Sequence, residues 1–272
     1  MLDVVFGQAS DAGRVRPLNE DAVASFVPRS REESDSRGWL FAVADGAGGR
    51  NLGEVASARA IRVITESFAQ SPENTPPAMV LPALIQAANT SVRQEGLSPE
   101  RRGHPMTTTI VACALRHDQA VISHVGDSRC YLVRDGKATQ LTPDHTWVNE
   151  QRTLGLITAI AAEQSEKRHV LTRCLGPEPT VAIDTTTTTL KPGDALVLCT
   201  DGLYDAMYPE DIARFAAQDC HAEQIAKDLV AYAVEADGSD NATAQVIQIK
   251  LIESVVGIPV CRTDCERSDH DS

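Results

Sequence analysis

The chain has 272 residues, of which 42% are apolar and 23% are charged, and 38 acidic residues against 25 basic ones give a formal net charge of −13. This length fits one large domain or two small ones, and the apolar fraction excludes wholesale disorder. Nucleic acid and anionic membranes repel so acidic a chain, so neither is an expected partner.

The first part of the chain combines short strands with two helices. The predicted strands are residues 2–9, 22–27 and Trp39 to Ala44. The polar segment from Pro28 to Gly38 is predicted to be a loop. Apolar residues recur at three- and four-residue spacings from Val55 to Phe68, which predicts an amphipathic helix. A proline-rich loop over 71–77 then leads to a second helix from near Pro82 to Gln94.

Strands dominate the second part of the chain. The predicted strands are residues 107–115, 119–125, 128–134, 181–190, 195–200 and 243–252. Turns at His117-Asp118 and Asp135-Gly136 predict that the first three form a meander. The turn from Lys191 to Asp194 predicts a hairpin between the next two. The predicted helical segments are 144–168, 209–218 and 222–235.

The threonine run from Thr185 to Thr189 favours a strand over a phosphorylated tract, because β-branched residues suit a pleated sheet. Helices that stand in separate blocks between antiparallel strands predict the α+β class rather than alternating βαβ units. The chain shows neither an internal repeat nor a linker. We therefore expect a single domain over residues 1–254, acting as a monomer, and a disordered tail over 255–272.

The cysteines suggest the compartment. The chain has seven, mostly isolated and several within apolar runs, as is typical of reduced thiols in the cytoplasm. The N-terminus lacks the pattern of a secretory signal, and no apolar stretch approaches a membrane span. Only Cys261 and Cys265 lie close together. Since His270 is the only nearby histidine, we interpret this segment as an ordinary tail rather than a zinc site.

Acidic residues stand where turns meet the ends of apolar strands. They occur in Asn19-Glu20-Asp21, Asp45-Gly46, Gly126-Asp127, Asp201-Gly202 and Asp240-Asn241. One Asp-Gly pair is ordinary turn chemistry. Several carboxylates at buried strand ends repel one another and are costly to desolvate, and divalent cations remove that cost. Magnesium and manganese favour such oxygen ligands, and glycine beside Asp45 lets backbone approach an ion or a phosphate.

Seven stretches together resemble the metal-dependent protein phosphatase family, of the protein phosphatase 2C type, in its compact bacterial form. In chain order they are SDAGRVRPLNEDA, LFAVADGAGGRNLGEVAS, MTTTIVACAL, HVGDSRCYLVRDGKATQLTPDH, VLTRCLG, LKPGDALVLCTDGLYD and SDNATAQVIQI. They span roughly residues 8 to 252. The resemblance implies a central sandwich of two antiparallel sheets with a pair of helices on each outer face, and a protein serine/threonine phosphatase activity.

The resemblance also implies a role for each acid. Asp45 matches the aspartate that bridges two metal ions, either Mn²⁺ or Mg²⁺, and Gly46 matches a carbonyl ligand of one ion. The other matches are Asp201 and Asp240 as ligands of the second ion, Glu20 and Asp21 as acids that hold metal-bound waters, Asp127 as an acid of a third, weaker ion, Arg16 as the phosphate-binding arginine, and Asn241 and Asp205 as supporting residues.

The implied mechanism needs no cysteine. Two bridged cations lower the pKa of the water between them, and this water attacks phosphorus in line, so no phosphoenzyme forms. Cys199 adjoins the site but its strand setting predicts packing. Ala47 stands where eukaryotic relatives carry a histidine that protonates the leaving group, and it cannot supply a proton. Thr107 replaces a usual glycine, which alters local packing.

The segment 146–169 corresponds to the family's mobile flap and is its least family-like part. His145 and His169 near it are either substrate contacts or solvated loop residues. Two other classes stay open: an inactive scaffold that binds phosphoproteins, against which the complete acid set argues, and a calcium-binding module, against which the lack of an EF-hand loop argues. The expected partners are proteins phosphorylated on Ser or Thr, including a cognate kinase.

Overall fold

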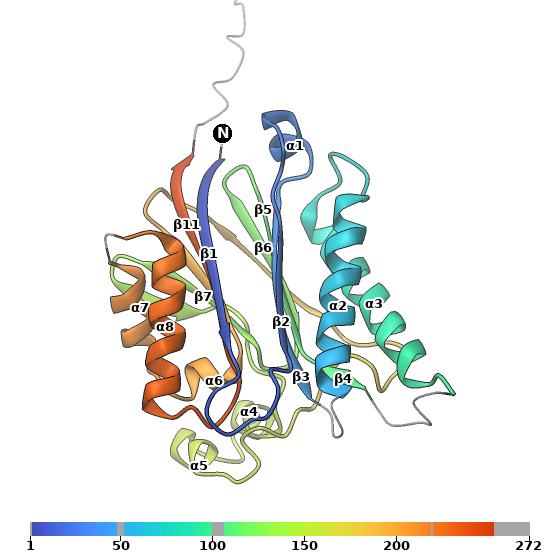
Figure 1. The fold of residues 1–272 in the computed structure, drawn as a ribbon, viewed down its shortest axis with the longest axis vertical. Helices are drawn as coiled ribbons and strands as arrows, with labels where there is room; N and C mark the ends of the chain where they lie inside the picture. The colour runs from blue at the N-terminus through green and yellow to red at the C-terminus, as the bar shows by residue number, and fades with distance from the viewer. Residues whose placement is uncertain (1, 48–51, 100–105, 219, 253–272) are drawn as a thin grey trace, which may run out of the picture.

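The structure of the chain, a computed structural model, describes residues 2–47, 52–99, 106–218 and 220–252 (Figure 1). The expectations for the tail and for Cys261, Cys265 and His270 concern residues outside these ranges. Among the described residues, no helix is long and apolar enough to cross a membrane.

Two antiparallel sheets form the centre of the molecule. The five-stranded sheet has the order β1 (Leu2–Asp11), β11 (Ala242–Ile252), β10 (Ala195–Cys199), β7 (Arg129–Arg134) and β8 (Lys137–Gln140). The other sheet has the order β2 (Asp21–Phe26), β3 (Trp39–Ala47), β5 (Ile110–Arg116), β6 (Gln119–Val125) and β9 (Asp184–Thr189), and the short β4 (Thr107–Thr108) pairs with β3.

Helices cover the outer face of each sheet (Figure 1). The pair α2 (Leu52–Ala69) and α3 (Pro77–Gly96) lies on the six-stranded sheet, and the pair α7 (Pro209–Ala216) and α8 (Ala222–Ala236) lies on the five-stranded sheet. The short helices are α1 (Arg31–Ser36), α4 (Trp147–Thr153), α5 (Ala159–Glu163) and α6 (Asp201–Tyr204). The predicted α+β class and its layered sandwich are confirmed.

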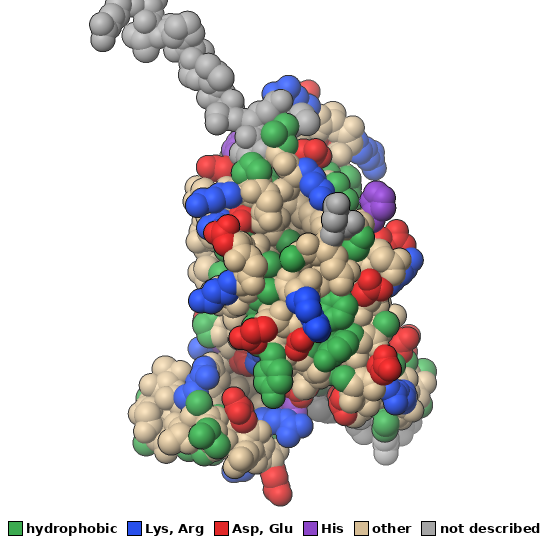
Figure 2. Space-filling view, turned by 90° about the vertical axis from the view of Figure 1, so that its left-hand side faces the viewer, with side chains coloured by type: hydrophobic (Ala, Val, Ile, Leu, Met, Phe, Trp, Pro, Cys, Tyr) green, Lys and Arg blue, Asp and Glu red, His purple; other side chains and the backbone are tan. Residues whose placement is uncertain are grey.

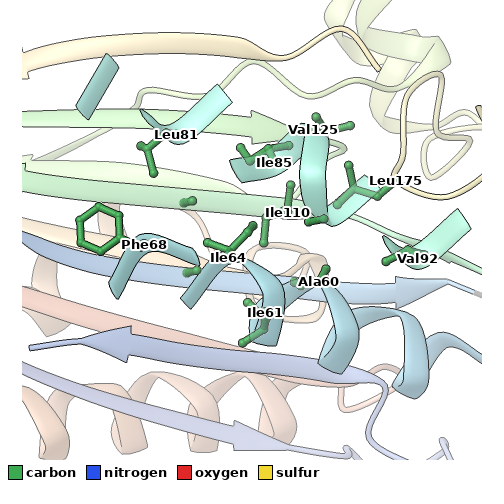
Figure 3. Close-up of a cluster of buried hydrophobic side chains, with 14 of the residues drawn as sticks. Ala60, Ile61, Ile64, Phe68, Leu81, Ile85, Val92, Ile110, Val125 and Leu175 are labelled. Atoms are coloured by element: carbon green, nitrogen blue, oxygen red, sulfur yellow. The ribbon is translucent and has the colours of Figure 1, made fainter. Parts of the chain in front are cut away.

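The layers are held together by three apolar clusters. One lies between α2, α3 and the six-stranded sheet and contains Phe68, Ile64 and Ile85 (Figure 3). A second fills the space between the two sheets, and the third lies under α7 and α8. Each fully buried Leu, Ile or Phe contributes about 1.5–3 kcal/mol. This packing fixes the positions of the strand ends, and therefore the positions of the acidic side chains at those ends.

Charges of both signs are interspersed over the face shown in Figure 2, and no single-sign patch dominates it. The surplus of acids therefore does not gather on this face.

Two local predictions are wrong. The expected loop from Pro28 to Gly38 contains α1, which begins because the Ser30 side chain accepts a hydrogen bond from the backbone N–H of Glu33. The second long helix begins at Pro77 rather than near Pro82, so that Pro82 lies inside it. Proline suits the first helical positions, where a backbone N–H has no partner to lose.

Two predicted strand pairings are also wrong. The meander breaks after β6, since β7 belongs to the other sheet and pairs with β8 and β10. The Asp135-Gly136 turn instead joins β7 to β8, a strand that was not predicted. The hairpin around Lys191 to Asp194 does not form either, because β9 pairs with β6 and β10 pairs with β7 and β11. The threonine run forms β9, as predicted.

Candidate metal centre and active site

A cleft of about 1140 Å³ opens where the strand ends of both sheets meet. Seven of the predicted site residues line it: Arg16, Glu20, Asp45, Gly46, Asp127, Asp201 and Asp240. In sequence they are up to 224 residues apart, as the contact between Arg16 and Asp240 shows. The predicted residue that does not line the cleft is Asp21, which lies beneath it.

The backbone of Asp45 is fixed at the end of β3. Its N–H donates to Thr109 Oγ1 at 2.9 Å, and its carbonyl accepts from Thr109 N at 2.8 Å and from Thr108 Oγ1 at 2.7 Å. The Thr109 hydroxyl, already an acceptor, is 2.6 Å from Ser128 Oγ. Asp45 and the segment around Asp127 are therefore joined by one hydroxyl pair, Thr109 and Ser128.

Asp21 lies opposite Asp45 in the β2–β3 pair. Its Oδ2 accepts hydrogen bonds from Thr200 Oγ1 at 2.9 Å and from Thr243 Oγ1 at 2.6 Å. Its Oδ1 is buried without a hydrogen-bond partner, and so is Oδ1 of Asp201. Burial of a carboxylate oxygen without a partner is costly, and a proton or a cation at either atom would remove that cost.

Glu20 is held by its backbone. Its N–H donates to Asn241 Oδ1 at 2.8 Å, and its carbonyl accepts from Gly46 N at 3.1 Å and from Ser57 Oγ at 2.5 Å. A Cβ at Gly46 would lie 2.2 Å from the Gly53 carbonyl oxygen, so this close approach admits only glycine. Asn241 also donates to two carbonyl oxygens of the loop that carries Arg16.

The acids raise one another's pKa values. Burial, followed by repulsion from Asp201, raises the pKa of Asp127 to about 8 and that of Asp45 well above its ordinary value. Burial raises the pKa of Asp21 to about 7, and burial with repulsion from Asp240 raises that of Asp201. Such a cluster favours protons or cations at neutral pH.

The donor set fits oxygen-ligand divalent cations. Its members are carboxylates beside a glycine carbonyl, two of them with orphaned oxygens. Over the described ranges, no group of three or more His, Cys, Asp or Glu side chains forms a preassembled ion cage. Arg16 pairs with Asp240 at 2.5 Å. This contact offsets part of the repulsion between the acids.

The two flap histidines have different surroundings. His169 lines the cleft, with Nδ1 3.6 Å from Asp201 Oδ2 and Nε2 3.3 Å from Asp205 Oδ2. His145 is not a solvated loop residue, because it is 4% exposed and its ring stacks on that of His124. It is also not among the residues that line the cleft. Thr107 pairs with Ala47 and donates its hydroxyl to the Ala47 carbonyl.

Sequence reasoning missed Arg129. Its guanidinium lines the cleft, lies 3.4 Å from the centroid of the Tyr204 ring and donates two hydrogen bonds to Asp144. Sequence alone gives no signal for these long-range contacts. The supporting hydroxyls of Thr200 and Thr243 were also missed, although Thr200 directly precedes Asp201.

An α+β sandwich that gathers carboxylates from both sheets into one cleft is the architecture of a metal-dependent hydrolase. A sequence profile of the family described as protein phosphatase 2C matches residues 16–236. The serine/threonine phosphatase stp of Listeria innocua is 30% identical over 247 residues, which cover 90% of this chain and 95% of that protein.

Solved structures agree with the sequence comparisons. The catalytic domain of the serine/threonine protein phosphatase PstP in complex with two manganese ions has a TM-score of 0.78 at 30% identity, covering 92% of this chain and 100% of that chain. The PPM Ser-Thr phosphatase MsPP from Mycobacterium smegmatis, in complex with cacodylate, has a TM-score of 0.76 at 33% identity, covering 90% of this chain and 97% of that chain. This chain belongs to the protein phosphatase 2C family of metal-dependent protein serine/threonine phosphatases.

Proposed function

We propose that this chain removes phosphate from phosphoserine and phosphothreonine in proteins, using divalent ions held in the cleft. The observation that carries the proposal is the convergence of Asp45, Asp201 and Asp240 from three separate strand ends. The full acid set argues against an inactive scaffold, since a binding module has no use for mutually repelling buried carboxylates.

The ion-binding residues in this proposal are those of the cleft and the layer beneath it. They are Asp45, Gly46, Asp201 and Asp240 as direct ligands of two ions, Glu20 and Asp21 as acids that hold ion-bound waters, and Asp127 as an acid of a third, weaker ion. When bound, the ions supply Lewis-acid stabilisation of the phosphoryl oxygens and lower the pKa of the attacking water. Mn²⁺ and Mg²⁺ both suit these oxygen donors.

Arg16 binds the substrate phosphate in this proposal. Its side chain is 51% exposed at the mouth of the cleft, and its planar guanidinium can donate two parallel hydrogen bonds to phosphate oxygens. Its Nη2 lies 2.5 Å from Asp240 Oδ2. Because the pair uses one guanidinium nitrogen and one oxygen of Asp240, we infer that an ion bound at Asp240 would weaken it and free the guanidinium for phosphate.

Hydrolysis proceeds without a phosphoenzyme. Cys199 adjoins the site, but it is fully buried among apolar residues, and burial raises its pKa to about 12. A thiol in that state is not a nucleophile. Water therefore attacks phosphorus directly. Since the Ala47 side chain has no acidic group, the leaving oxygen takes its proton from water.

The proposal also covers the domain, the oligomeric state and the compartment of the enzyme. We propose that residues 1–254 form one catalytic domain, active as a monomer in the cytoplasm and opposing a cognate serine/threonine kinase. Free buried thiols such as Cys113 and Cys130 suit a reducing compartment.

The test is hydrolysis of a phosphothreonine peptide, followed by released phosphate. We expect turnover with Mn²⁺ and none with EDTA. Turnover that survives EDTA would contradict the metal-dependent mechanism. An absence of turnover with Mn²⁺ and with Mg²⁺, for a folded protein and several phosphopeptides, would favour the scaffold.

A further inference from the structure

Asp127 lies between β6 and β7, in a segment that makes no strand pairing. The turn from Gly126 to Ser128 connects β6 in one sheet with β7 in the other, so no shared ladder fixes it. Gly126 has a φ of 104°, and a Cβ there would lie 2.6 Å from the Thr109 side chain. The direction in which Asp127 enters the cleft must therefore be set by contacts from elsewhere in the chain.

His145 holds the residue before Asp127. Its backbone N–H donates to the Gly126 carbonyl at 3.0 Å, and its ring Nδ1 accepts from Gly126 N–H at 3.1 Å. Both polar backbone groups of Gly126 are thus bound by one residue. Because Nδ1 accepts, the neutral ring carries its proton on Nε2.

The ring of His145 is itself fixed from two sides. Nε2 lies 3.2 Å from Asp184 Oδ2 and 3.3 Å from Arg173 Nη1, and Arg173 Nη1 also donates to Asp184 Oδ1 at 2.9 Å. His124 stacks on the ring with centroids 4.5 Å apart and donates from Nε2 to the Pro143 carbonyl at 2.8 Å. The ring therefore presents Nδ1 to Gly126 in one orientation.

Asp144 binds Arg129, which follows Asp127 by two residues. Its carboxylate accepts two hydrogen bonds from Arg129, at 2.9 Å from Nε and 2.6 Å from Nη2. A bidentate pair of this kind fixes direction as well as distance. The same guanidinium lies over the ring of Tyr204, in the helix that begins at Asp201.

We propose that the consecutive residues Asp144 and His145 are positioning residues for Asp127, binding the chain on both sides of it and linking its orientation to the start of the flap. The proposal rests on the ion-binding role given above to Asp127. Neither residue touches the ions or the substrate. Their loss should weaken ion binding at Asp127 and leave the fold in place.

Two substitutions of His145 separate the positioning contact from packing. In His145→Asn, the amide oxygen takes the place of Nδ1 and still accepts from Gly126. In His145→Gln, the amide reaches the Nε2 position and the acceptor for Gly126 is lost. Calorimetric titration with Mn²⁺ measures the affinity of each site directly, and the melting temperature in EDTA reports the fold.

We expect His145→Gln to weaken the lowest-affinity Mn²⁺ site about tenfold and His145→Asn to stay within about twofold of the wild type. The Mn²⁺ concentration for half-maximal activity should shift in parallel, with KM for the phosphopeptide unchanged. Unchanged Mn²⁺ affinity in His145→Gln, or equal losses in both variants, would overturn the proposal.

If His145→Gln does not fold, Asp144→Asn takes its place, since it keeps the side-chain shape but loses the charged bidentate pair, and the same tenfold weakening is expected. Unchanged Mn²⁺ affinity in that variant overturns the proposal equally. A wild-type protein that binds Mn²⁺ but hydrolyses no phosphopeptide would refute the proposed function alone, because calorimetry still tests the positioning role.

Discussion

Asp21 and Asp45 lie directly opposite each other in the antiparallel pair β2–β3, where Asp45 lines the cleft and Asp21 does not. Opposed acids of like charge destabilise a sheet. Two buried threonine hydroxyls offset this by donating to Asp21 Oδ2, but Oδ1 has no partner. The pair therefore costs stability when both acids are charged, and a cation bound at the proposed site would offset that cost.

The stability of the metal-free protein should fall as the pH rises. The pKa values of Asp21 and Asp127 are about 7 and about 8 in the folded protein, against an ordinary value of 3.8. The folded state then binds protons more tightly than the unfolded chain, so the stabilisation is complete below about pH 4 and is lost as the pH rises through 7 to 8. Each group contributes at most about 1.4 kcal/mol per pH unit.

Melting temperatures in EDTA from pH 5 to 8.5 measure this effect, and saturating Mn²⁺ should flatten the profile. Asp21→Asn should raise the melting temperature in EDTA at pH 8, because the amide removes a buried charge, and should reduce the stabilisation that Mn²⁺ gives. The exposed Asp3→Asn is the matched control and should change neither. A profile in EDTA that rises with pH would contradict the assignment.

Arg16→Ala should raise KM for a phosphothreonine peptide about tenfold to a hundredfold, since a hydrogen bond to a charged group is worth about 1.5–3 kcal/mol. Arg16→Lys should recover part of the loss, because it keeps the charge but not the planar fork. The exposed pair with Asp240 adds less than about 1 kcal/mol to stability, so both variants should melt as the wild type does. Unchanged KM in Arg16→Ala would refute phosphate binding by Arg16.

Thiol modification should leave activity intact. The thiols of Cys113, Cys130 and Cys199 are fully buried, and burial raises the pKa of each. Iodoacetamide applied to the native protein should leave these residues unmodified by mass spectrometry, with turnover retained. Loss of turnover that tracks alkylation of Cys199 would point to thiol chemistry instead.

The sequence locates the acids because each one directly follows or precedes an apolar strand. The pattern at Asp45 and Asp201, a buried strand followed by Asp-Gly, suffices to put a carboxylate at a sheet end. It does not reveal the register that sets Asp21 against Asp45, since register depends on residues that are distant in sequence.

Sheet membership could not be predicted from the same patterns. Alternating and buried strands look alike in either sheet. The patterns therefore predict links within one sheet at the segment around Asp127 and at the turn after Leu190, where the chain in fact crosses between the sheets. Leu190 N–H in fact donates to the Asp118 carbonyl, which keeps it beside β6. The helix α1 is different, because Ser30 three residues before Glu33 was a readable capping signal.

The most direct test of the metal centre is calorimetric titration of the metal-free protein with Mn²⁺, comparing the wild type with Asp45→Ala. We predict that the wild type binds at least two ions and that Asp45→Ala loses high-affinity binding together with phosphopeptide turnover. Asp45→Ala that binds Mn²⁺ with the wild-type number and affinity would contradict the assignment of this cleft as the metal centre.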